Sequence, residues 1–395
     1  MIQPNSMFSQ LLSVISRNEF NSTVRELKVD KYSKGFDSWD HFVSMLFCHL
    51  ADAKSLREIS YGLQSCVGKL NHLGMKQAPK RSTLSYANKN RSWELFERIF
   101  YQLLERCSSA APGKKRKFRF KNELLSLDAS NIEMCLSVFD WAKYRKTKGA
   151  IKLHTLLDHN GYLPRYIRIT DGKTHEINIA HEIKLPAGSI VAMDRGYTDY
   201  GLFEKWDQKG IYFVIRLKAN AQYEIVRQEE CPKNRNIVKN QIIRIKGVSK
   251  ELRMIEVFDK DKLEWIQIIT NKTDFGPSTI SAIYKDRWGI ETFFRTLKQN
   301  FHIKTFVGTS ANAVMIQIWT ALISMLLVQY LRFLSKFSWS MSNLVVLFRM
   351  NMFTYKNLWI WINDPFEIPP EPDGPIQLFL PGLGLGQHNS QSQTV

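Results

Sequence analysis

The segment that decides how this chain is interpreted is "YKDRWGIETFFRTLKQN", residues 284–300. It is rich in charged and aromatic residues and has the apolar spacing of an amphipathic helix. Tyr284, Arg287, Glu291 and Lys298 stand at offsets 0, 3, 7 and 14, so about 100° per residue places all four within roughly 60° on one helix face. A solvated helix face with an Arg287–Glu291 pair at i,i+4 gives the same pattern, and this segment alone favours that simpler interpretation.

The overall composition favours a folded protein with a polyanionic partner. The chain has 395 residues, 44% of them hydrophobic and 12% aromatic, which is enough for a large core and two or three domains. The net charge of +18 suits nucleic acid, with an anionic membrane surface as the weaker alternative.

The five cysteines form no CxxC pair and no Cys/His cluster with zinc spacing. We therefore expect free thiols in a reducing cytoplasm. The first twenty residues place no charged region before an apolar run, so we do not expect a signal peptide.

One segment, residues 306–331, is long, apolar and uncharged. A membrane span needs about 20 such residues. Gln317, Thr320, Ser324 and Gln329 interrupt this run. We expect a buried central helix and no membrane partner, and a single membrane span is the alternative.

Residues 1–113 are predicted to be helical. A helix that begins near Ser82 carries polar and basic residues in its first turns, and with the preceding short helix it resembles a helix-turn-helix. DNA contact and a purely structural role both remain open for this pair.

Six of the eight residues 114–121 are Lys or Arg, which suits either a solvated linker or a phosphate-binding track. The phosphate contacts expected there come from Lys114, Lys115, Arg116 and Lys117.

From residue 122 the pattern is that of an α/β protein. The apolar strands "ELLSLDAS" and "GSIVAMDRGY" are predicted to end in Asp128 and Asp194, and Asn160-Gly161 marks a hairpin. Strand-like alternation fills residues 220–275, and Glu291 lies on the helix that follows.

Three carboxylates without a Cys/His cluster are typical of a Mg²⁺ or Mn²⁺ site. Two such ions about 3.5–4 Å apart can hold both the attacking and the leaving oxygen of a phosphodiester.

These motifs together resemble those of DDE transposases of the insertion-sequence-four family. The spacing Tyr-(2)-Arg-(3)-Glu-(6)-Lys in residues 284–298 is similar to that family's signature, and "LDAS" and "MDRGY" are similar to its first and second acidic motifs. The segments "FDWAKYRKTKGAIKLHTLLD" and "VGTSANAVMIQIWTALI" resemble the family too. The similarity covers roughly residues 1–360.

The resemblance implies a ribonuclease-H-like catalytic core interrupted by a β-rich insertion. We expect a helical N-terminal DNA-binding domain (1–113), a basic linker (114–121), the core (122–219 and 276–305), the insertion (220–275), a C-terminal helical region (306–363) and a disordered tail (364–395).

The resemblance also implies the roles of single residues. Asp128, Asp194 and Glu291 are expected to hold two Mg²⁺ ions, with Mn²⁺ as a substitute. Tyr284, Arg287 and Lys298 are expected to contact phosphates of the DNA. Trp265 is expected either to stack on a flipped base or to belong to the core of the insertion, and the resemblance leaves open whether a hairpin forms on the transposon end.

We therefore predict the transposase of a bacterial insertion sequence. It would bind double-stranded DNA at terminal inverted repeats, cleave it, and join the 3′-hydroxyl ends to target DNA as a dimer. The alternatives are a nuclease of the same fold without strand transfer, a DNA-binding regulator that has lost catalysis, and a membrane protein.

Overall fold

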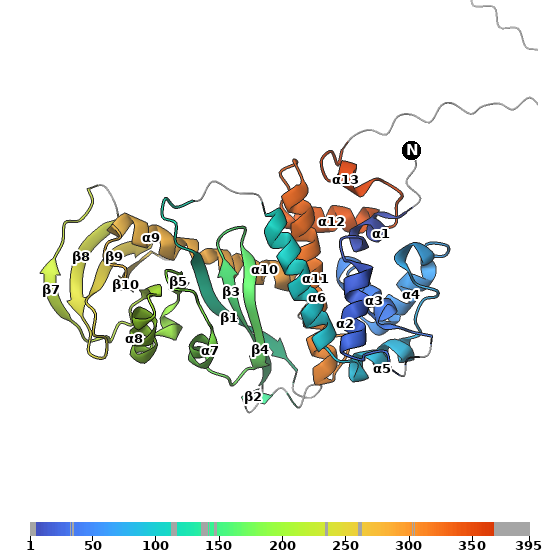
Figure 1. The fold of residues 1–395 in the computed structure, drawn as a ribbon, viewed down its shortest axis with the longest axis horizontal. Helices are drawn as coiled ribbons and strands as arrows, with labels where there is room; N and C mark the ends of the chain where they lie inside the picture. The colour runs from blue at the N-terminus through green and yellow to red at the C-terminus, as the bar shows by residue number, and fades with distance from the viewer. Residues whose placement is uncertain are drawn as a thin grey trace, which may run out of the picture.

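The chain forms a large mixed sheet at one end and a bundle of helices at the other (Figure 1). The computed structural model describes residues 5–366 except 32, 34, 112–116, 136–140, 142, 146–147, 234–235, 260–262, 302 and 304. Most of the expected tail therefore lies outside the described residues, as do Lys114, Lys115 and Arg116 of the expected linker.

The helical end is built from segments far apart in the sequence. Its N-terminal helices are α1 (Met7–Leu12), α2 (Arg17–Glu26), α3 (Ser38–Leu50), α4 (Leu56–Ser65), α5 (Arg81–Asn90) and α6 (Glu94–Ala110). Its C-terminal helices are α11 (Ala311–Leu334), α12 (Met341–Asn351) and α13 (Leu358–Trp361).

The strands of the sheet are β1 (Leu124–Met134), β2 (Lys143–Arg145), β3 (Lys148–Asp158), β4 (Leu163–Asp171), β5 (Ile190–Met193), β6 (Tyr212–Arg216), β7 (Glu224–Gln228), β8 (Ile237–Arg244), β9 (Leu252–Asp259) and β10 (Glu264–Thr270). Their order is β2-β3-β1-β5-β6-β10-β9-β8-β7, with β4 beside β3. β1, β5 and β6 are parallel, whereas β3 is antiparallel to β1. This mixed α/β arrangement is consistent with a ribonuclease-H-like core, and β7–β10 extend the same sheet beyond β6.

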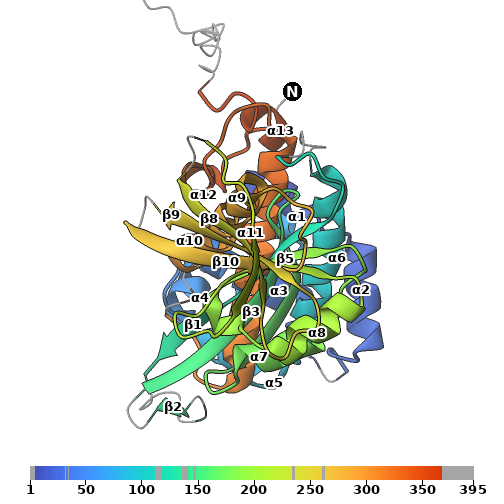
Figure 2. The same cartoon turned by 90° about the vertical axis from the view of Figure 1, so that its left-hand side faces the viewer.

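Alternate residues of the central strands face two different layers. Val191 and Met193 of β5 pack on one face with α8 (Tyr200–Gln208), and α7 (Glu176–Glu182) lies on that side too. Ile190 and Ala192 face the opposite layer with Ile280 of α9 (Pro277–Asp286). Figure 2 views the molecule from the sheet end, with strands between these layers. A strand buried on both faces explains why "IVAM" is continuously apolar.

Asp128 does not end its strand, contrary to the expectation. β1 continues to Met134 because its second half stays paired with β3. Its parallel pairing with β5, however, stops at Leu127↔Met193. Asp128 and Asp194 are therefore the next residues of two adjacent parallel strands, immediately after the last paired positions.

The apolar helix α11 is a core helix, which confirms the expectation. It is long and apolar enough to cross a membrane, but 83% of its apolar window is buried inside the protein. Two of its buried polar side chains form hydrogen bonds within the protein. Gln317 Oε1 accepts from the Val307 N–H at 2.8 Å, and the Thr320 hydroxyl pairs with His49 Nε2 at 3.0 Å.

Acid should destabilise the helical end through His41 of α3. This ring is buried, and its Nε2 pairs with Asn88 Oδ1 at 2.7 Å. Burial, followed by the charge of Arg91, lowers the pKa of His41 to about 3. The unfolded chain protonates this histidine near pH 6.5, so the free energy of unfolding should fall as the pH drops from 6.5 towards 3, by up to about 1.4 kcal/mol per pH unit.

Urea unfolding at pH 7 and pH 5 measures this effect. His41→Gln should lose less stability between the two pH values than the wild type, whereas the exposed His175→Gln should behave as the wild type does. An equal loss in wild type and His41→Gln would show that His41 is not responsible.

Candidate active site

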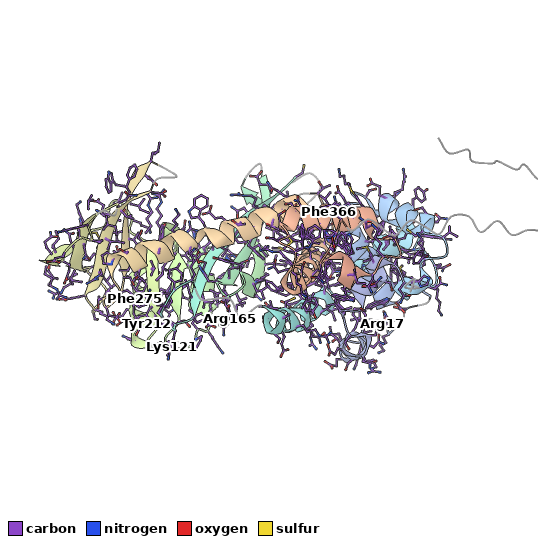
Figure 3. The ribbon with its side chains drawn as sticks, turned by 90° about the horizontal axis from the view of Figure 1, so that it is seen from above. Arg17, Lys121, Arg165, Tyr212, Phe275 and Phe366 are labelled. Atoms are coloured by element: carbon purple, nitrogen blue, oxygen red, sulfur yellow. The ribbon has the colours of Figure 1, made fainter. Side chains whose placement is uncertain are left out.

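The predicted strip does not lie on one uninterrupted helix. Tyr284 belongs to α9, which ends at Asp286, and α10 (Trp288–Asn300) carries Glu291 and Lys298. Arg287 is the single residue between the two helices. Its N–H is shared between the carbonyls of Ile283 and Tyr284, both at 3.3 Å, so the chain tightens locally without changing direction. Figure 3 shows α9 and α10 as a nearly continuous line from the sheet towards the helical end.

Arg287 bridges two of the predicted carboxylates. Its Nη2 lies 2.9 Å from Glu291 Oε1, and its Nη1 lies 3.4 Å from Asp128 Oδ2. The guanidinium is buried, with 4% of the residue exposed. The sequence predicted the i,i+4 contact with Glu291, and the structure adds the contact to β1.

Burial raises the pKa of Asp128 to about 7. The charge of Arg287 and a hydrogen bond from the Ala129 N–H oppose this rise, and the charges of Asp194 and Glu176 add to it. A buried acid among other acids is costly to ionise unless cations compensate it.

Asp194 caps the 3₁₀ turn η3 (Arg195–Tyr197), where its Oδ1 accepts from the Gly196 N–H at 2.8 Å. A Cβ on Gly196 would sit 2.9 Å from Asp194 Oδ1 and 3.5 Å from Glu176 Oε2. Gly196 thus leaves open the space beside two carboxylate groups. Glu176, the first residue of α7, was not among the residues predicted for the site.

The residues predicted to contact DNA lie in different surroundings. Tyr284 is 9% exposed and lines a cavity of about 360 Å³ between α9 and the outer strands. Lys298 Nζ donates to the Asn131 carbonyl of β1 at 2.8 Å. Trp265 is 49% exposed on β10. Lys117 forms an ion pair with Asp286.

A buried cluster around Asp286, also missed by the sequence analysis, fixes the start of α10. His159 Nδ1 donates to the Asp286 carboxylate, and His159 Nε2 pairs with the Ser126 hydroxyl at 2.6 Å. Tyr162 donates to the same carboxylate at 3.0 Å. Burial alone would raise the pKa of Asp286, but the hydrogen bonds from His159 and Lys117 outweigh it and lower that pKa to about 2.

The Ser126–His159–Asp286 line has the connectivity that activates a nucleophilic serine in hydrolases. Ser126 is fully buried within β1, so a substrate cannot reach its hydroxyl. The cluster is therefore structural: it ties the α9–α10 junction to β1 and to the β3–β4 turn.

His154 of β3 is a core histidine. It is fully buried, and its Nε2 pairs with Thr170 Oγ1 at 2.9 Å.

Comparison with known proteins identifies the family. Residues 119–327, just over half of the chain, match the family described as "Transposase DDE domain". The chain belongs to the DDE transposase family. Residues 3–76 also match a "Domain of unknown function (DUF4372)".

Several curated relatives of this DDE transposase carry transposase names. It is 31% identical over 193 residues to "Putative transposase y4zB" of Sinorhizobium fredii, covering 47% of this chain and 54% of that protein. It is 24% identical over 255 residues to "Probable transposase for insertion sequence element IS5377" of Geobacillus stearothermophilus, covering 63% and 67%. It is 26% identical over 174 residues to "Transposase InsG for insertion sequence element IS4" of Escherichia coli, covering 40% and 38%.

DDE transposases generally use divalent metal ions, and the residues of this chain fit such an ion in chemistry. The candidate ligands are carboxylates, the space beside Gly196 is open, and the buried Tyr197 hydroxyl has no hydrogen-bond partner within the described residues. In the described part of the chain, however, no three His, Cys, Asp or Glu side chains are gathered closely enough to chelate one ion.

The position of α10 should depend on the glycine beside Tyr162. A Cβ on Gly289 would meet the Tyr162 ring at 2.4 Å, whereas a Cβ on Gly276 would meet nothing within 4 Å. Gly289→Ala should lower the free energy of unfolding by about 1–3 kcal/mol, because the ring or the helix must move. Gly276→Ala, measured by the same denaturant titration, should change it by less than about 0.5 kcal/mol. Equal stability of the two variants would contradict the packing described for Tyr162.

Proposed function

We propose that this DDE transposase acts for a bacterial insertion sequence of the insertion-sequence-four family. It binds the terminal inverted repeats of its element, cleaves the DNA and joins the 3′-hydroxyl ends to a target phosphodiester. One observation carries the proposal: Asp128 and Asp194 follow the last paired positions of two adjacent parallel strands, and Arg287 holds Glu291 of α10 towards the first of them.

Asp128, Asp194 and Glu291 would hold two Mg²⁺ ions in this proposal. When bound, such ions supply an activated water and stabilise charge on the attacking and leaving oxygens. Arg287 keeps Asp128 and Glu291 at a fixed separation, and its buried charge lowers the cost of ionising Asp128. Lys298, whose Nζ donates to the Asn131 carbonyl of β1, would contact a DNA phosphate near the cleaved end.

The proposed DNA-binding surface of the helical end lies on α5. Its exposed residues Arg81, Ser85, Tyr86 and Lys89 fall on one helix face, opposite the buried Leu84. A face that combines cations, a hydroxyl and a phenol suits contacts to the DNA backbone. Lys114, Lys115, Arg116 and Lys117 remain proposed phosphate contacts of the linker, and Lys117 would have to exchange its ion pair with Asp286 for one with DNA. A dimer in the DNA complex is part of the proposal.

Removal of one acid tests the reaction. Asp194→Ala should abolish cleavage of labelled end DNA in Mg²⁺, because the carboxylate holds metal, and should leave binding of the same DNA within about threefold, because the proposed binding surfaces lie elsewhere. Gel-shift and cleavage assays on one preparation measure both properties.

Normal cleavage by Asp194→Ala would refute the assignment of the site. A joining assay with a target plasmid then separates a transposase from a nuclease, since a nuclease cuts the ends and leaves them unjoined.

Trp265 is proposed to stack on a DNA base that leaves the helix during hairpin formation. Its ring lies 5.1 Å from that of its cross-strand neighbour Phe258, which in turn lines the cavity beside Tyr284. Stacking returns about 1–3 kcal/mol, so Trp265→Ala should slow the hairpin step by roughly tenfold to a hundredfold. First-strand nicking requires no extruded base and should keep its rate.

A time course on a denaturing gel resolves nicked and hairpin products. Leu263→Ala, which removes another exposed apolar side chain near the start of β10, is the control and should leave both steps unchanged. Equal slowing of both steps by Trp265→Ala would instead assign this residue to the packing of the outer strands.

A further inference from the structure

Glu176 lies beside the second aspartate of the site, although it is 18 residues earlier in the chain. Its Oε2 and the Oδ1 of Asp194 both lie within 3.5 Å of the point where a Cβ on Gly196 would sit. The Glu176 side chain is 31% exposed, so an ion or a small ligand can reach it from solvent.

Lys152 of β3 forms an ion pair with one oxygen of the Glu176 carboxylate. Lys152 Nζ lies 3.4 Å from Glu176 Oε1 and donates to the Thr174 carbonyl at 3.0 Å. The lysine side chain is 10% exposed, so it is largely shielded from competing water. One carboxylate oxygen of Glu176 lies beside the lysine, and the other lies beside Gly196.

A second observation at the same place points to a missing partner. The Tyr197 ring and hydroxyl are fully buried, and within the described residues its Oη has no hydrogen-bond partner. The charges that act on this hydroxyl are those of Asp128, Glu176 and Asp194, followed by Arg287. A buried hydroxyl without a partner is unfavourable, so a ligand held beside these carboxylates would stabilise it.

The charges of the side chains around this place also favour a bound cation. Asp128, Asp194, Glu176 and Glu291 are four carboxylates, whereas Arg287 and Lys152 return two positive charges. The negative charge that remains favours the binding of divalent cations by this group.

We propose that Glu176 is a fourth carboxylate of the metal site, binding the divalent ion on the Asp194 side together with Asp194. The proposal rests on the transposase function proposed above. It assigns Glu176 a direct role towards the metal, so its effect should appear in metal binding as well as in cleavage.

The test measures Mn²⁺ binding to the full-length protein from the free-Mn²⁺ signal in electron paramagnetic resonance. Glu176→Gln should weaken Mn²⁺ binding by at least about tenfold and slow single-turnover cleavage of end DNA by at least as much. Lys152→Met removes the same ion pair but leaves the carboxylate, so it should keep Mn²⁺ affinity within about threefold of the wild type or improve it. Glu182→Gln, at the exposed end of α7, should match the wild type.

Wild-type Mn²⁺ affinity in Glu176→Gln would overturn the proposal. An equal loss of affinity in Lys152→Met would also overturn it, because Glu176 would then act only through its ion pair. If melting curves show that Glu176→Gln does not fold, Glu176→Ala replaces it, and unchanged Mn²⁺ affinity in that variant refutes the proposal. Failure of the wild type to cleave end DNA would refute the transposase function, whereas the Mn²⁺ comparison would still test Glu176.

Discussion

The carboxylate of Asp286 is the point on which the geometry of the candidate site depends. It receives hydrogen bonds from His159 and Tyr162 of the β3–β4 turn and an ion pair from Lys117 of the linker. A carboxylate this deeply buried is stable only when such donors compensate its charge. Since Asp286 closes α9 immediately before Arg287, these donors fix where α10 begins, and therefore where Glu291 stands.

Neighbouring residues at this junction serve two separate networks. Asp286 is bonded to the β3–β4 turn and the linker, whereas Arg287 is bonded to Asp128 of β1. Because Asp286 is already satisfied by its own donors, it does not compete for the Arg287 guanidinium, which remains available to the acids of the site. The adjacent and oppositely charged Asp286 and Arg287 thus bind different partners. Each of them anchors the start of α10 to a different part of the core sheet.

The sequence predicted those parts of the site that depend on local patterns. Asp128 and Asp194 were proposed because each comes after an apolar run in the sequence, and the Arg287–Glu291 contact was predicted because i,i+4 neighbours share a helix face. The break between the two helices at Arg287 and the burial of Tyr284 were not predicted. Helical periodicity does not show at which residue the backbone hydrogen bonding of a helix changes. The Asp286 cluster joins residues 33 and 127 positions apart, and no periodic signal connects them. Glu176 escaped notice for the same reason: within "THEINIAHE" it is an ordinary acid in the first turn of a helix.

Two glycines, Gly289 and Gly196, determine how closely other groups approach α10 and the Asp194 carboxylate. At Gly289 the absence of a side chain lets the Tyr162 ring lie against α10, so the helix approaches the β3–β4 turn more closely than any other residue would permit. At Gly196 the same absence keeps open the space between Asp194 and Glu176. The first glycine brings the helix that carries Glu291 onto the sheet, and the second prevents the protein from filling the space that its carboxylates face. The two glycines thus act at different places: the one in α10 sets the distance between that helix and the β3–β4 turn, and the other leaves room beside the Asp194 and Glu176 carboxylates.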